Sequence, residues 1–246
     1  MAEKRSNEDF VSNVVYGKGN MFERWKQFTP WVYDNQNKVI IFGEIYTKLE
    51  YSNTASEGAE KFYRTIIKVN SKEKEVNLIP IIVPSPIIDT GLLLPGKWIA
   101  AAGKYSSYKE KTENGYTHRI LFLSVQEIYV FDTPLEIIAA GHVNLVYFCG
   151  IIHTKPEIKV KKSGKNIADF ILAVHNNHGK TAYIPCTTSN KIAQIVVNLD
   201  VGTEVVIRGR IKSIGYFKDA SIGNISSVQT KIVVSSLYLS EEEAKK

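Results

Sequence analysis

The feature that most constrains the fold of this chain is an internal repeat. The segment "NKVIIFGEIYTK" at 37–48 aligns with "NLVYFCGIIHTK" at 144–155, an offset of 107. Two later pairs keep the same order and nearly the same spacing: "NLIPI" at 77–81 with "AYIPC" at 182–186, and "LPGKWIAAAGKYSS" at 94–107 with "DVGTEVVIRGRIKS" at 200–213. Because self-similarity at a fixed offset indicates a duplicated structural unit, the sequence predicts two tandem domains.

The repeat also predicts where these domains lie. We expect the first domain at 37–130, a linker at 131–141 and the second domain at 142–240, with a short charged tail at 241–246. The remaining N-terminal arm, residues 1–36, contains a short amphipathic pattern after Asn20. An arm packed on the first domain is the simplest interpretation, and self-association or recruitment of a partner protein are the alternatives.

Within each copy, short segments rich in Val, Ile, Tyr and Phe are separated by Gly, Pro, Asn and Ser, a pattern typical of strands. In the second copy we predict strands at 143–152, 166–175, 181–187, 203–213 and 228–238. A helix is predicted between the third and fourth strands, with Ser189 as N-cap and an apolar stripe of Ile192, Ile195, Val196 and Leu199. This order predicts an all-β protein of two tandem five-stranded Greek-key barrels of the oligonucleotide-binding (OB) type.

The helix is expected in at least the second barrel. In the first copy the corresponding segment, "VPSPII", is interrupted by Pro86, which resists helix formation together with the residue before it.

Charge is distributed unequally between the two copies. The chain has a formal net charge of +6; residues 1–140 hold 17 basic and 17 acidic side chains, whereas residues 141–246 hold 14 basic and 8 acidic ones. The excess therefore belongs to the second half, where it favours an anionic partner.

Alternation along the predicted strands sorts side chains between the barrel interior and the surface. In "EVVIRGRIK", Val205, Ile207, Gly209 and Ile211 form an apolar inner set, which leaves Arg208, Arg210 and Lys212 in a line outside. Tyr183 lies opposite the inner set of its own strand, and the tip after the cationic strand carries Tyr216, Phe217 and Lys218. Cations beside aromatic rings suit single-stranded nucleic acid, because charges follow the phosphates and rings stack on bases.

A lysine-rich segment, "KVKKSGK", joins the first and second strands of the second copy. Its lysines are Lys159, Lys161, Lys162 and Lys165. Loops at this place flank the ligand groove in barrels of this type, so we expect a salt-sensitive electrostatic funnel. A solvated hairpin without a ligand is the alternative.

The first copy lacks most of these features. Alignment replaces Arg208 by Ala102, Arg210 by Lys104 and Tyr183 by Leu78. Its remaining candidates for nucleic-acid binding are Lys104, Tyr108 and Lys109, and its outward residues Trp98, Ala100 and Ala102 predict an apolar packing surface. We therefore expect the second barrel to do most of the binding.

The second copy resembles the bacterial single-stranded DNA-binding proteins over about 95 residues. The resemblance rests on "NLVYFCGIIHTKPEIKVKKSGKNIADFILAVHN" followed by "TAYIPCTTSNKIAQIVVNLDVGTEVVIRGRIKS". The first copy keeps only the framework, so the whole chain is similar to tandem-barrel members of that family in Gram-positive bacteria and their phages. The family's stacking aromatics correspond to His178, Tyr183 and Tyr216.

The resemblance also implies an assembly and a way of contacting partners. Family members reach four barrels by tetramerising, so two barrels per chain imply a homodimer. They recruit replication proteins through an acidic C-terminal tip after a Gly-rich linker. This chain ends "LYLSEEEAKK", so we expect replication proteins, where they bind, to use another surface.

The sequence therefore favours a non-enzymatic, sequence-tolerant single-stranded DNA-binding protein that acts in DNA replication, recombination or repair. We expect no catalytic residues, cofactor or metal, because the sequence has no Gly-rich phosphate loop, nucleophile and base pair or metal-ligand cluster. Two alternatives stay open: an accessory interaction subunit of a primosome or phage replisome, and an RNA-binding OB-fold protein.

Localisation follows from what the sequence lacks. Cys149 and Cys186 lie in predicted strands without metal-ligand neighbours, which predicts small buried residues in a reducing compartment. No signal peptide and no apolar run of about 18 residues is visible. We expect a cytoplasmic, nucleoid-associated protein without a membrane partner.

Overall fold

The computed structural model describes residue 24 and residues 37–52, 61–70, 75–111, 117–131, 143–161, 163–175, 180–218 and 225–239. The N-terminal arm apart from Arg24, the linker from residue 132 onward and the C-terminal tail lie outside the described residues. The predictions about these segments therefore stay predictions.

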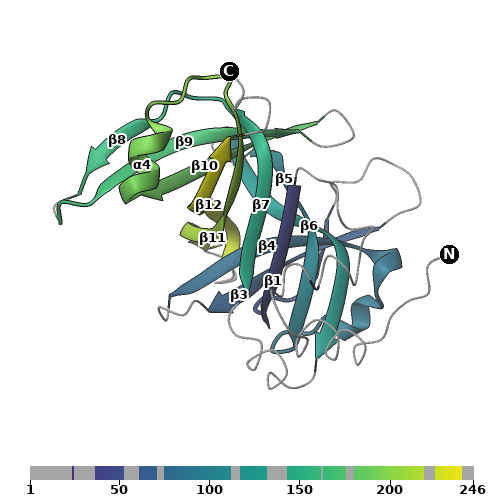
Figure 1. The fold of residues 1–246 in the computed structure, drawn as a ribbon. Coiled ribbons are helices and arrows are strands. Elements are labelled where there is room, and N and C mark those ends of the chain that lie inside the picture. The colour runs from purple at the N-terminus through teal and green to yellow at the C-terminus, as the bar shows by residue number, and fades with distance from the viewer. Residues whose placement is uncertain are drawn as a thin grey trace.

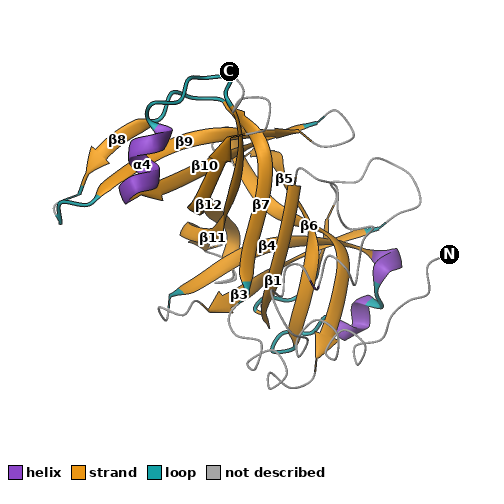
Figure 2. Cartoon of the chain, viewed as in Figure 1, coloured by secondary structure: helices purple, strands orange, loops and turns teal. Residues whose placement is uncertain are grey.

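The described part of the chain is almost entirely strand (Figures 1 and 2). The first repeat forms β1 (Asn37–Ile45), β2 (Glu50–Ser52), β3 (Phe62–Asn70), β4 (Val76–Pro84), β5 (Trp98–Lys111) and β6 (Thr117–Phe131). The second repeat forms β7 (Asn144–Ile152), β8 (Glu157–Val160), β9 (Asn166–His175), β10 (Thr181–Ser189), the helix α4 (Asn190–Val196), β11 (Glu204–Lys218) and β12 (Ile225–Leu239).

Each repeat closes into a barrel by the same pairings. In the first, β1 pairs with β5, β5 with β6, β6 with β4 in parallel, β4 with β3, and β3 returns to β1. In the second, β7, β11, β12, β10 and β9 pair in that order and β9 returns to β7. The prediction of two tandem five-stranded barrels is confirmed.

The two repeats also share particular hydrogen bonds, which shows that their strands hold equivalent positions. The amide of Asn37 donates to the carbonyl of Tyr105 and accepts from its N–H, both at 2.8 Å. Asn144 makes the same two bonds, at 2.8 Å, with Ile211. These pairs are related by offsets of 107 and 106, as the sequence alignment requires.

The barrels are joined edge to edge by an antiparallel pairing of β1 with β7, which lie side by side in Figure 1. The register places Val39 opposite Val146. Since these two residues are equivalent in the repeat, the pairing is centred on a pseudo-two-fold axis that relates one barrel to the other. All twelve strands consequently belong to one continuous sheet.

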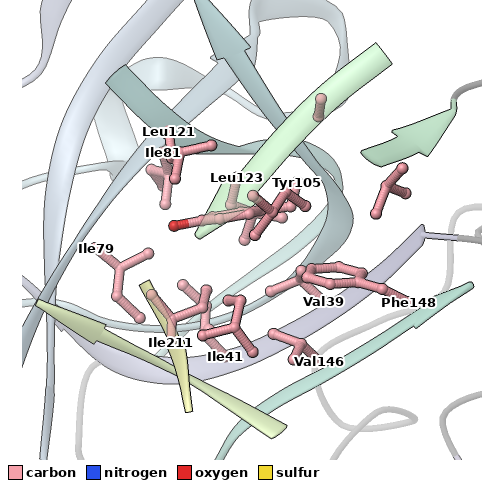
Figure 3. Close-up of a cluster of buried hydrophobic side chains, with 14 of the residues drawn as sticks. Val39, Ile41, Ile79, Ile81, Tyr105, Leu121, Leu123, Val146, Phe148 and Ile211 are labelled. Carbon is pink, nitrogen blue, oxygen red and sulfur yellow. The ribbon is translucent and has the colours of Figure 1, made fainter. Parts of the chain in front are cut away.

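A single hydrophobic core runs through both barrels. Figure 3 shows the ring of Tyr105 among buried apolar side chains from the two repeats, including Val39, Val146 and Ile211. The Tyr105 ring stacks on that of Phe148, with centroids 6.1 Å apart and planes 19° apart. This shared burial stabilises the relative placement of the barrels.

The predicted helix forms, but its buried side differs from the predicted stripe. Ala193 and Val196 are the buried residues of α4, whereas Ile195 is 52% exposed. The backbone of Ser189 is extended, as at an N-cap, but its side chain makes no capping hydrogen bond. Because α4 has only seven residues and rests on its Ala193–Val196 side, Ile195 points away from the barrel.

The first repeat has two 3-10 turns, Ser85–Ile87 and Thr90–Leu92, in place of this helix. Pro86 lies in the first of them, in agreement with its expected effect.

Strand lengths differ from the predictions around the loops. Next to their connecting turn, β11 continues to Lys218 and β12 begins at Ile225, whereas the predicted strands end at 213 and begin at 228. Part of the predicted lysine loop is a strand, β8, paired with β9. The β11–β12 ladder continues as far as Lys218 opposite Ile225, and β8 adds an edge strand to the sheet beside β9.

Candidate nucleic-acid interface

The lysine-rich segment is an ordered hairpin rather than an open loop. Its turn is closed by hydrogen bonds from the N–H of Gly164 to the carbonyl of Lys161, 2.8 Å, and from the N–H of Lys161 to the carbonyl of Lys165, 3.0 Å. Gly164 has a φ of +75°, a conformation that favours glycine. Lys159, Lys161 and Lys165 are exposed, and Lys162 lies outside the described residues. The hairpin therefore presents ammonium groups to solvent.

Beside this hairpin the surface of the second barrel is hollowed into an open groove of about 340 Å³. We call it the second-barrel groove. It is lined by Thr154, Lys155, Glu157, Asp169, Phe170, Ile171, Pro185, Cys186 and Lys231. Its volume falls within the roughly 300–1,000 Å³ typical of small-molecule sites, so it has room for a group the size of a nucleobase.

Lysines border this groove on two sides. Lys159 lies on β8 at one side, and Lys231 lies on β12 at the other. Lys212 is the direct cross-strand partner of Lys231, which brings the end of the cationic strand β11 next to the groove. The predicted lysines of two separate segments are thus brought to one surface by the strand order β11, β12, β10, β9, β8.

Two carboxylates that line the groove, Glu157 and Asp169, offset part of this positive charge. Asp169 accepts a hydrogen bond from Lys159, with Nζ and Oδ2 3.3 Å apart. Partial burial acts to raise the pKa of Asp169, but hydrogen bonds from Thr187 and Lys159 and the charge of Lys231 together hold this pKa below its usual value. Asp169 is therefore ionised at neutral pH, and the groove is cationic at its edges rather than throughout.

Tyr183 lies on the same face of β10 as the groove residue Pro185. Its neighbours Ala182 and Ile184 are buried, so the expected alternation holds. The half-buried ring contacts the ring of His153, with centroids 4.6 Å apart and planes 56° apart. The guanidinium carbon of Arg119, from β6 of the first barrel, lies 5.0 Å from its centroid. Tyr183 is thus an aromatic platform where the two barrels meet.

The three cations predicted along β11 have different surroundings. The guanidinium carbon of exposed Arg208 lies 5.8 Å from the ring centroid of Tyr147, near the seam between β1 and β7. Lys212 forms an ion pair with Glu75 of the first barrel at 2.9 Å. The hydrogen bond and charge of Lys212, and the charge of Arg210, lower the pKa of Glu75. Lys212 therefore borders the groove, whereas Arg208 lies farther along the strand.

Several predicted site residues fall outside what the structure describes. Tyr216, Phe217 and Lys218 lie on β11, but only their backbone is described. His178 and Lys162 lie outside the described residues altogether. Their assignment to the interface stays a prediction.

In the first barrel the equivalent surface is a pocket of about 40 Å³, too small for a base. Tyr108, a predicted site residue, lines it and packs on Phe122 with ring centroids 5.6 Å apart. Phe122 holds the strand position that Lys231 holds in the second barrel, and Val228 from the second barrel closes another side. The aromatic pair and the neighbouring valine fill the space that is open in the second barrel.

The other first-barrel candidates lie on β5. Lys104 is half-buried and Lys109 is exposed. Of the predicted packing surface, Ala100 and Ala102 are buried and Trp98 is half-buried, as a packing surface requires.

Lys231, His153 and Arg119 lie at this surface and were not among the predicted site residues. Lys231 alternates with buried Thr230 and Ile232, so the strand alternation could have identified it. His153 and Arg119 meet Tyr183 from another loop and another barrel. No pattern in a single sequence indicates these contacts, because they depend on how the barrels are placed.

Among the described residues there is no group of three or more His, Cys, Asp or Glu side chains that could hold a metal ion. No helix in the described part of the chain is long and apolar enough to cross a membrane. Cys186 is buried as predicted, whereas Cys149 is only half-buried.

Known proteins resemble the fold of this chain and the sequence of its second barrel. A search of curated protein sequences gives no match. Among solved structures, the chain is similar to the wild-type single-stranded DNA binding protein from Thermus aquaticus, with a TM-score of 0.61, 15% identity, and coverage of 82% of this chain and 92% of that one. A deletion mutant of that protein gives a TM-score of 0.58 at 15% identity, covering 82% of this chain and 93% of that one.

These structural likenesses, at low identity, concern the fold. The sequence of the second barrel carries more information, because residues 143–240 match the model of the single-strand binding protein family. The matched segment spans β7 to β12, including every lining residue of the second-barrel groove. The second barrel of this chain is therefore similar in sequence to the single-strand binding protein family.

Proposed function

We propose that this protein binds single-stranded DNA in a sequence-tolerant manner, across the second-barrel groove, and acts in DNA replication, recombination or repair. The observation that carries the proposal is an open groove bordered by Lys159, Lys212 and Lys231 and by the half-buried ring of Tyr183. The groove lies within the segment that matches the single-strand binding protein family, which supports this ligand over other anions.

The chemistry of these side chains explains why binding would tolerate many sequences. Lysine ammonium groups act as point charges toward phosphates and do not read base edges. An aromatic ring accepts any base, because every base has a π face. Binding would therefore depend on an unpaired, flexible strand and on ionic strength more than on sequence.

The two barrels would contribute unequally. The first-barrel pocket is small and is partly filled by Tyr108 and Phe122, whereas the second-barrel groove is open and cationic at its edges. We propose that the first barrel supplies packing and a smaller share of phosphate contacts, and that two chains assemble into a dimer with four barrels.

The experiment that tests the function is a titration of fluorescent oligo-dT with the full chain at several salt concentrations. Tight binding that weakens steeply with salt is expected, with a slope of about −0.7 per phosphate contact for a single strand. Tyr183→Ala should weaken binding by about 1–3 kcal/mol, the range for one stacked base. Lys231→Ala should lower both the affinity and the salt slope.

Lys191→Ala is a matched control, because Lys191 is exposed on α4, at the far end of β10 from Tyr183. It removes one positive charge without touching the groove, so it should bind nearly as the wild type does. Arg208→Ala should have a smaller effect than Lys231→Ala. Equal affinity for oligo-dT and for duplex of the same length would refute the proposal. Tighter binding to a matched RNA would instead indicate an RNA-binding protein.

A further inference from the structure

The β5–β6 hairpin and the β11–β12 hairpin each cross onto the other barrel, and the two crossings hold equivalent positions. In the first barrel, Arg119 on β6 lies two residues beyond Leu121, the partner of Ser107. In the second barrel, Val228 on β12 lies two residues beyond Thr230, the partner of Ser213. Since Ser107 and Ser213 are aligned in the repeat, Arg119 and Val228 are structural equivalents.

The surfaces that receive these two residues are equivalent as well. Tyr183 lies opposite Ala173 in the second barrel, and Leu78 lies opposite Lys68 in the first, with the same offset of 105 for both partners. The contact of Arg119 with Tyr183 is therefore the pseudo-symmetric counterpart of the contact of Val228 with Leu78.

The chemistry at the two crossings is nevertheless opposite. Val228, Leu78 and Ile66 form a buried apolar cluster, and the backbone N–H of Leu78 donates to the hydroxyl of Ser213 beside it. All three side chains are buried, and we call this contact the sealed crossing. At the other contact, which we call the open crossing, Arg119 is exposed and the ring of Tyr183 is half-buried. The Val228–Leu78 contact shows that an apolar pair can join the barrels at this position, so their joining does not require a cation on an aromatic ring.

The surroundings of Arg119 also leave its guanidinium charge available to pair with a phosphate. In the part of the chain that the structure describes, the recorded contact of Arg119 is the ring of Tyr183, and no carboxylate is paired with it. A guanidinium over a partly exposed ring contributes about 0.5–2 kcal/mol, whereas a stacked base contributes about 1–3 kcal/mol. A base could thus replace it on the ring, and the displaced guanidinium would remain within reach of the adjoining phosphate.

We propose that Arg119 is a single-stranded DNA contact that the first barrel supplies to the second-barrel groove. On binding, a base takes the place of the guanidinium on Tyr183, and Arg119 pairs with a phosphate of the same strand. The bound DNA then contacts both barrels at the open crossing and makes no contact at the sealed crossing. This inference rests on the proposed function and assigns a site residue to it.

The test uses the full chain with Arg119→Val, which installs the residue type of the sealed crossing. Oligo-dT affinity is measured by fluorescence anisotropy at several salt concentrations. We expect affinity to fall about three- to tenfold at low salt and the salt slope to lose about 0.7, the contribution of one phosphate contact. The melting temperature should be unchanged or higher, because the substitution replaces an exposed cation with the apolar contact of the other crossing. Arg119→Lys keeps the charge and should keep the slope.

Tyr183→Ala and the double variant complete the measurement. Because both residues meet the strand at one place, the double variant should lose less affinity than the product of the two single losses. Wild-type affinity and slope in Arg119→Val would overturn the inference, and so would tighter binding. In either case normal oligo-dT binding by the wild type would leave the proposed function standing. Failure of the wild type to prefer oligo-dT over duplex would reject the function itself.

Discussion

The hydroxyl of Tyr105, on β5 of the first barrel, lies 2.5 Å from the hydroxyl of Thr230, on β12 of the second. Tyr105 is fully buried and Thr230 is 4% exposed. Burial raises the pKa of Tyr105 although the hydrogen bond with Thr230 lowers it, so the phenol stays neutral. This hydrogen bond therefore links the two barrels inside the core that they share.

Removing one hydroxyl of this pair should destabilise the protein. Tyr105→Phe leaves the Thr230 hydroxyl buried without this partner, which should lower the free energy of unfolding by about 1–3 kcal/mol. Urea denaturation followed by circular dichroism measures the change. Tyr105→Phe combined with Thr230→Val should cost less than the sum of the two single changes. Strict additivity would show that the hydroxyls do not interact.

A glycine at the β11 bulge should resist substitution because another backbone lies against it. A Cβ on Gly209 would lie 2.3 Å from the carbonyl oxygen of Val233, and the equivalent Gly103 has the same crowding against Ser124. We expect Gly209→Ala to lower stability by about 1–3 kcal/mol, as overpacking does. Gly215→Ala is the control, because nothing lies within 4 Å of its Cβ position. Similar melting temperatures for the two variants would contradict this interpretation.

Cys149 should alkylate slowly at neutral pH. Partial burial, and the nearby carboxylate of Glu204 with Sγ and Oε1 3.6 Å apart, raise its pKa to about 11. Because the thiolate is the nucleophile, carbamidomethylation near pH 8 should run about a hundredfold slower than for an unperturbed thiol, and its rate should climb until pH passes about 11. Mass spectrometry of the Cys149 peptide gives the rate. Glu204→Gln should lower the pKa and speed the reaction, whereas an unchanged rate would exclude the carboxylate as a cause.

Glu75 should compete with DNA for Lys212. Glu75→Gln removes the carboxylate that pairs with Lys212, so oligo-dT affinity should rise about two- to fivefold at low salt, in keeping with about 0.2–1 kcal/mol for an exposed ion pair. The gain should disappear at high salt because screening weakens both contacts. Asp89→Asn removes an equal charge from a first-barrel turn and keeps an oxygen for its bond to Gly91. An equal gain in that control would indicate a net-charge effect.

Much of the fold was predictable because it follows from local pattern. The alternation in β11 correctly separates buried Val205, Ile207 and Ile211 from outward Arg208, since a strand sends successive side chains to opposite faces. The stripe of α4 was predicted less well, and Ile195 is exposed. Periodicity alone does not say which side of a short helix rests on the barrel.

The candidate site was only partly predictable. Lys159 and Tyr183 were identified from charge, alternation and resemblance, and the structure brings both to the surface around one groove. Lys212 was predicted to be an outward nucleic-acid contact, and the structure pairs it with Glu75 across the two barrels. Sequence spacing carries no information about such a partner, 137 residues away.

The sequence by itself determined that this chain is a duplicated barrel with a basic second copy, because repeat, strand alternation and charge are properties of residues close together in the chain. Only the tertiary structure decided which outward residues meet. The β1–β7 pairing centred on Val39 and Val146 sets how the barrels sit, and the long hairpins then carry Arg119 onto Tyr183 and Val228 onto Leu78. The same pseudo-symmetry yields one sealed and one open crossing, because the residues at the equivalent positions differ in charge and polarity.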